Sequence, residues 1–126
     1  MNDETNSAKK KNLKERTEDF ALRVITMYCS LPKNTLAQVL GNQVLRSGTS
    51  IGAHYREATR ARSNAEFISK IEGGLQELEE TAYWFGLLTK SNIVSEKRMS
   101  GLLTELNELT AIFTASAKTA KKRQNK

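Results

Sequence analysis

The sequence predicts an all-α protein, an antiparallel up-down-up-down bundle of four helices. Apolar residues recur at three- and four-residue steps along most of the chain, which is the period of amphipathic helices. A single proline among 126 residues allows these helices to be long. Aromatic residues make up only 6% of the chain and β-branched residues are scattered, which argues against a sheet. Four such helices with short connections are typical of a bundle.

The first two helices are predicted at residues 13–30 and 34–61. The first helix ends at Leu31-Pro32, because the residue before a proline avoids the α region. Cys29 lies within it and is expected to be a small buried residue. The apolar stripe of the second helix consists of Leu36, Leu40, Val44, Ser47, Ile51, His54 and Ala58.

The third and fourth helices are predicted at residues 64–90 and 95–120. Ser63-Asn64-Ala65-Glu66 has the spacing of a capping box, in which the serine accepts from the backbone and the glutamate reaches back. The last helix carries a heptad seam of Met99, Leu102, Leu106, Leu109 and Phe113. The chain therefore divides into a disordered polar tail at 1–11, the bundle at 12–120 and a basic tail at 121–126.

Composition predicts a cytoplasmic protein with no membrane partner. The chain has no apolar run of signal-peptide or membrane-span length. Its one cysteine cannot form an internal disulfide, which suits a reducing compartment. The net charge of +6 favours anionic partners such as RNA or DNA.

No residue pattern indicates catalysis, so we expect no enzyme activity, no catalytic residue, no metal and no cofactor. A di-iron bundle needs two Glu-x-x-His motifs, and this chain has one histidine. His54 lies beside the apolar stripe and is expected to be a packed core or interface residue. Cys29 has no evident base partner in the sequence.

Three glycines of the second helix lie on one flank of its apolar stripe. On a helical wheel, Gly41, Gly48 and Gly52 fall together near Tyr55. Such a flank allows another backbone to approach closely. Two interpretations follow, a tight crossing inside the bundle or an interface between copies of the chain.

The same helix carries an arginine face opposite its apolar stripe, formed by Arg46, Arg56 and Arg60. The third helix places Glu77 and Glu80 on one face together with Trp84, which would lie in water in a monomer. We favour ion pairing of the two faces between subunits, with Trp84 as an interface anchor. The alternatives are phosphate binding by the arginines, a solvated face, or ion pairing with a neighbouring acidic helix.

The chain ends in a cluster of cations, Lys118, Lys121, Lys122 and Arg123. No acidic residue lies near them in the sequence. A basic tail of this kind can attach to phosphate backbones without sequence preference.

Residues 41–88 resemble a known family through the segments GNQ-x-LRS-GTSIGA, YREA, EFI-x-K and ET-x-YW. These segments resemble the bacterial four-helix bundle proteins called the 23S rRNA intervening-sequence protein family. The resemblance implies a ring-like homopentamer and genes found within sequences inserted in large-subunit rRNA genes. It also implies an architecture similar to the accessory bundle proteins of diversity-generating retroelements, which bind nucleic acid and a reverse transcriptase.

Together these observations favour a non-enzymatic homo-oligomer that binds nucleic acid through a basic surface. The competing interpretation is a protein-interaction scaffold or accessory protein, whose partner is another protein and whose charge merely aids solubility.

Overall fold

The computed structural model describes residues 11–124, which form four α-helices and no strand. They are α2 (Leu13–Cys29), α3 (Thr35–Thr59), α4 (Asn64–Lys90) and α5 (Glu96–Gln124). The all-α prediction is confirmed, and the observed bounds follow the predicted ones closely. The exception is the end of α5, where residues 121–124, expected to belong to a tail, continue the helix. Of the predicted N-terminal tail at 1–11, residues 1–10 lie outside the described residues, as do residues 125–126.

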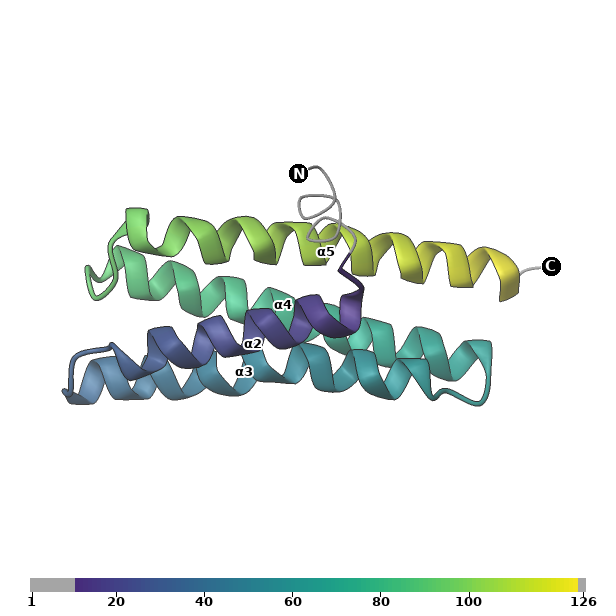
Figure 1. The fold of residues 1–126 in the computed structure, drawn as a ribbon, viewed down its shortest axis with the longest axis horizontal. Helices are drawn as coiled ribbons and strands as arrows, with labels where there is room; N and C mark the ends of the chain where they lie inside the picture. Colours follow the sequence, from purple (N-terminus) through teal and green to yellow (C-terminus); the bar gives the residue numbers. More distant parts are fainter. Residues whose placement is uncertain (1–10, 125–126) are drawn as a thin grey trace, which may run out of the picture.

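Helices that follow one another in the sequence pack side by side (Figure 1). Their contacts give the directions. Gly41 lies against Leu31 and Gly52 against Thr17, so α3 runs back along α2. Arg46 meets Glu80 of α4, and Asn64 at the start of α4 meets Ala120 near the end of α5. The helices therefore alternate in direction around one core.

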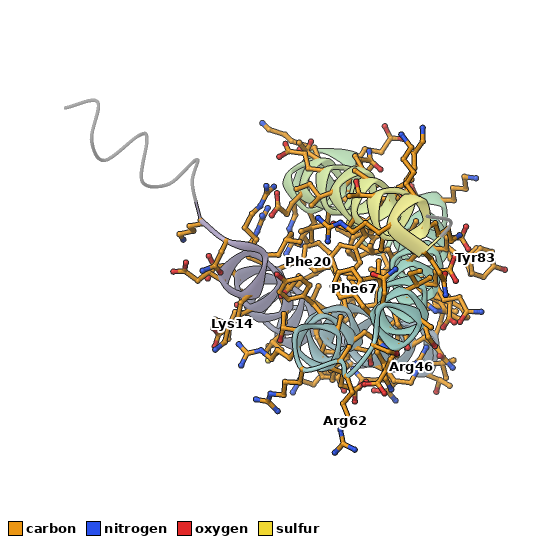
Figure 2. All side chains as sticks on the ribbon, turned by 90° about the vertical axis from the view of Figure 1, so that its right-hand side faces the viewer. Lys14, Phe20, Arg46, Arg62, Phe67 and Tyr83 are labelled. Carbon is orange, nitrogen blue, oxygen red and sulfur yellow. The ribbon has the colours of Figure 1, made fainter. Side chains whose placement is uncertain are left out.

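The core draws large side chains from every helix, among them Phe20 of α2, Ile51 of α3, Phe85 of α4 and Phe113 of α5. The rings of Phe20 and Phe85 lie 6.3 Å apart between centroids. Figure 2 looks along the bundle and shows Phe20 and Phe67 pointing between the helices, while Tyr83 points outward. A single apolar core thus holds all four helices together.

Short polar side chains fix the helix starts. Asn12, Asn34 and Ser63 each accept a hydrogen bond from a backbone N–H of the first turn that follows. The Glu66 carboxylate accepts from the backbone N–H of Arg62 at 3.2 Å, so the predicted reach-back occurs one residue before the serine cap. In the turn after α4, Asn92 has a φ of 63°, a left-handed conformation that asparagine tolerates.

The glycine flank of α3 faces α2 of the same chain. A Cβ added at Gly48 would lie 3.0 Å from both methyl carbons of Val24, and one at Gly41 would lie 2.7 Å from Leu31. At Gly52 the added atom would lie 3.1 Å from Thr17 Oγ1. The subunit interface predicted at these glycines is therefore replaced by the other interpretation, a tight crossing inside the bundle, because α2 already covers them.

Three further expectations need correction. Tyr55, expected beside a subunit interface, packs inside the bundle with its ring 6.0 Å from that of Phe113. Cys29 is exposed rather than buried, because it ends α2 on the side away from the core. Leu36, assigned to the apolar stripe, is 54% exposed, because it faces solvent while the next residue, Ala37, is the one that is buried in the core.

The glycine crossing yields a stability prediction. Gly48→Leu should lower the free energy of unfolding by about 1–3 kcal/mol or more, because the side chain would overlap Val24 in a filled space. Gly86→Ala is the matched control. An added Cβ there meets nothing within 4 Å, so this change should stabilise the helix by about 0.4–1 kcal/mol. Urea unfolding measures both, and equal stability of Gly48→Leu and wild type would contradict the crossing.

Candidate nucleic-acid interface

One end of the bundle is built by α3, α4 and α5 alone among the described residues. Helix α2 has 17 residues, whereas the other helices have 25, 27 and 29. Its first turns lie beside Gly52 and Arg56 of α3, short of the turn between α3 and α4. Figure 1 shows this turn and the C-terminal end of α5 at the same end of the molecule. Two segments far apart in the sequence are thereby neighbours.

A direct hydrogen bond joins these two segments. The Asn64 side chain amide donates to the backbone carbonyl of Ala120 at 2.6 Å. Ala120 itself is only 3% exposed, so the last turns of α5 are packed against the start of α4. The cations on the two segments are consequently held at the same end of one rigid structure.

Among the described residues, six exposed cations gather at this end, which we call the basic end: Arg60, Arg62, Lys118, Lys121, Lys122 and Arg123. The sequence predicted all of them except Arg62. This residue lies in the turn before α4, where helical periodicity gives no signal. Figure 2 shows Arg62 extending outward from the end of the bundle.

A groove of about 330 Å³ between α4 and α5 holds three of these cations, Lys118, Lys121 and Lys122. Glu72 also lines it and lies 2.6 Å from the Lys121 ammonium, measured from Oε2 to Nζ. Both groups are about half exposed, so water weakens this pair. The groove therefore offers two ammonium groups without a carboxylate partner among the described residues and one that shares its charge with Glu72.

The arginine face of α3 does not act as one group. Arg46 lies about 21 Å along the helix axis from Arg60, given a rise of about 1.5 Å per residue. Its guanidinium bridges Glu77 and Glu80 of α4. Hydrogen bonding to Glu77 raises the pKa of Arg46 above its ordinary value. Arg46 thus pairs with the two glutamates inside the chain, and not between subunits as favoured from the sequence, because α3 and α4 pack side by side.

Arg56 has a weaker partner than Arg46. Its guanidinium lies 3.6 Å from Glu18 of α2, whose side chain is 61% exposed. Arg60, by contrast, has no ion pair among the described residues. Of the three arginines proposed as phosphate ligands, Arg60 is the one that joins the basic end with its charge uncompensated.

The contact between α3 and α4 contains a polar layer. Ser47 and Thr81 are fully buried and hydrogen-bonded, with their hydroxyl oxygens 2.8 Å apart. Beside them the Glu77 side chain is 13% exposed and lies 3.7 Å from His54 Nε2. His54 in turn packs over Gly73, which has no side chain in the way. Glu77 and His54 are therefore parts of an intramolecular contact, as expected for a packed histidine.

Trp84 is half-buried and packs against the core, so it does not lie in water as the sequence suggested. The exposed aromatic residue is its neighbour Tyr83, which is 61% exposed. The two rings lie 5.0 Å apart between centroids in an edge-on arrangement. Of the residues predicted at a subunit interface, Glu80 and Trp84 still reach the surface. Tyr83 was not predicted as an interface residue, because its position on the helical wheel gives no sign of a contact.

Within residues 11–124, no group of three or more histidine, cysteine, aspartate or glutamate side chains is placed to hold a metal ion. No helix in this part of the chain is long and apolar enough to cross a membrane.

Comparison with known proteins agrees with the fold and the motifs. The family described as 23S rRNA-intervening sequence protein matches residues 9–115. A crystal structure of a protein of unknown function from the S23 ribosomal protein family of Bacteroides thetaiotaomicron superposes with a TM-score of 0.80 and 34% sequence identity. The alignment covers 85% of this chain and 99% of that one. No curated protein matches this chain. The chain belongs to the 23S rRNA-intervening sequence protein family.

Proposed function

We propose that this protein is a non-enzymatic, self-associating four-helix bundle that binds nucleic acid through its basic end. The observation that carries the proposal is the meeting of two cationic segments. Arg60 and Arg62 on the α3–α4 turn lie at the same end as Lys118, Lys122 and Arg123 on the last turns of α5. Guanidinium and ammonium groups clustered in this way favour a phosphate backbone.

Helix stability alone explains part of this cluster. Cations in the last turn of a helix stabilise its dipole, which applies to Lys121, Lys122 and Arg123 of α5 and to Arg60 at the end of α3. Arg62 is different, because it precedes the N-terminus of α4, where the dipole favours anions. A ligand that carries negative charge would compensate for its position.

Binding of this kind should tolerate many sequences. Lysine and arginine contacts to phosphates carry no base information, and no exposed aromatic ring accompanies the cations at the described part of the basic end. Self-association would add affinity, because several copies present several basic ends at once. The homopentameric ring implied by the family resemblance is the assembly we propose.

The first test removes cations from the basic end. Lys118→Gln/Lys122→Gln/Arg123→Gln should weaken binding to both structured RNA and duplex DNA by about tenfold or more at low salt. The logarithm of the binding constant decreases linearly with the logarithm of the salt concentration. For duplex DNA, the steepness of this decrease should become smaller by about 0.9 for every phosphate contact that is lost. Fluorescence anisotropy at two salt concentrations measures both quantities.

The matched control places the same charge change at the opposite end, as Lys33→Gln/Lys90→Gln/Lys97→Gln. All three of these lysines are exposed. If both triple variants weaken binding equally, general charge attraction is responsible and the basic end is not a site. If wild-type protein binds neither nucleic acid at low salt, the proposal fails and the protein-interaction scaffold replaces it.

A second prediction uses the carboxylate in the α4–α5 groove. Glu72→Gln should strengthen nucleic-acid binding several-fold, because Lys121 loses the partner that lies 2.6 Å away and becomes available to a phosphate. Glu15→Gln is the control, since it makes the same charge change on an exposed part of α2, away from the groove. An equal gain from both variants would assign the effect to net charge.

Self-association is tested separately by light scattering. At about 10–100 µM, a range in which even weak interfaces are populated, the mass should be a multiple of the 14.1 kDa chain. Five copies are expected. A monomer throughout this range would reject self-association, whatever the outcome of the nucleic-acid measurements.

A further inference from the structure

A seam with unused binding groups runs between α2 and α5. Helix α2 packs mainly on α3 and contacts α5 sparsely. Two grooves of about 640 and 410 Å³ follow this seam and share Leu22 and Arg23. The floor of the second groove is apolar, formed by Met27, Val94 and Leu102. Charged side chains dominate the lining of the first groove, so apolar surface is open only in the second groove, at the α2–α5 end that carries Arg98.

Two arginines border this floor. Arg98 donates a hydrogen bond to Ser30 Oγ at 3.0 Å, and the Arg23 guanidinium lies over Gly101, where an added Cβ would be 3.0 Å away. Within residues 11–124 neither has a carboxylate partner, whereas Arg16 at the far end of the seam is bound by Glu105 and Glu108. The groove therefore suits an occupant that combines apolar side chains with a carboxylate.

The opposite side of the molecule presents such a combination on the outer face of α4. Glu79, Tyr83 and Leu87 recur at four-residue steps and therefore form one line along the helix. Leu87 is half-buried, because part of its side chain packs against the core, and Glu79 and Tyr83 are exposed. Tyr83 is 61% exposed and rests against Trp84. Glu79 has no ion pair among the described residues. Figure 2 shows Tyr83 pointing away from the bundle on the side across from α2.

We infer that the α4 stripe of one copy, Glu79, Tyr83 and Leu87, docks into the α2–α5 groove of a second copy. This inference rests on the self-association proposed above and names the two surfaces that perform it. Tyr83 and Leu87 cover the apolar floor, and the Glu79 carboxylate pairs with Arg23 or Arg98. The two surfaces are complementary in charge, because the stripe carries a carboxylate and the groove carries two guanidinium groups. They are also complementary in shape, because Tyr83 projects from α4 and the other surface is a groove.

The geometry of this contact differs from that of a two-fold dimer. The two surfaces are different and lie on opposite sides of the bundle, so each docked copy still offers one open groove and one open stripe. Such a contact is heterologous and continues from copy to copy until a ring closes. A dimer with no further growth is incompatible with it.

Charge reversal tests the pairing. Arg23→Glu/Arg98→Glu should raise the dissociation constant of assembly about tenfold or more, because the groove then repels Glu79. Glu79→Arg should do the same from the other surface. All three changes in one chain should recover at least part of the assembly. Lys33→Glu/Lys97→Glu is the control, with the same change in net charge on residues that do not line the groove. Its mass in light scattering should equal that of wild type.

Circular dichroism shows whether each variant is folded. If Arg23→Glu/Arg98→Glu fails to fold, Tyr83→Ala serves instead, because its side chain is mostly in solvent and its removal should weaken assembly without unfolding the chain. An oligomeric wild type whose mass is unchanged by Glu79→Arg and Tyr83→Ala overturns this inference and leaves self-association standing. A monomeric wild type overturns both.

Cross-linking distinguishes the symmetry. A chain carrying Thr26→Cys in the groove and Leu87→Cys on the stripe, with Cys29→Ser to remove the native thiol, is treated with a short bismaleimide. The docking predicts a ladder of trimers and larger species, because each copy links to two neighbours. Products that stop at dimers, or no products from an oligomeric sample, would contradict it.

Discussion

The close approach of α2 to α3 over three glycines determines where the other surfaces of the bundle lie. Each glycine in a helix costs about 0.5–1 kcal/mol relative to alanine, and the packing of Val24 and Thr17 against the α3 backbone offsets that cost. Because α2 is held tightly to α3, it contacts α5 only sparsely, and the groove between them stays open. Because α2 is also the shortest helix, it leaves the basic end to α3, α4 and α5. The groove thus follows from the crossing, and the basic end follows from the short length of α2.

The fold could be predicted almost completely, because its determinants are local. Apolar spacing, proline and capping residues such as Ser63 each act within a few positions of the chain. The errors concern residues whose surroundings depend on a second helix. A wheel places Gly48 on a flank but does not say that α2 covers that flank, nor that Cys29 turns away from the core. The extra turn of α5 was missed because its lysines were interpreted as a tail, although lysine is a good helix former.

The candidate site could be predicted only in part, for the same physical reason. A wheel projects a helix along its axis, so it groups Arg46 with Arg60 although the helix separates them by about 21 Å. It also cannot show that Glu77 and Glu80 neutralise Arg46 within the chain. Glutamates pair with arginines along the middle of the bundle, as Arg16 does with Glu105. Arginines that pair in this way are neutralised within the chain, whereas Lys118 and Lys122 at the basic end have no carboxylate partner among the described residues.

The two proposals support each other through geometry. The stripe and the groove run along the sides of the bundle, so docking through them leaves the basic end uncovered. If α4 of one copy lies in the groove of the next copy with the two bundles pointing in the same direction, neighbouring copies are related by a rotation. The axis of this rotation is parallel to the helices. Every copy then presents its basic end on one face of the ring, and the cations of Arg62, Lys118 and Lys122 are repeated around that face. A phosphate backbone crossing it meets several weak sites in succession, which converts modest contacts into strong, salt-sensitive binding.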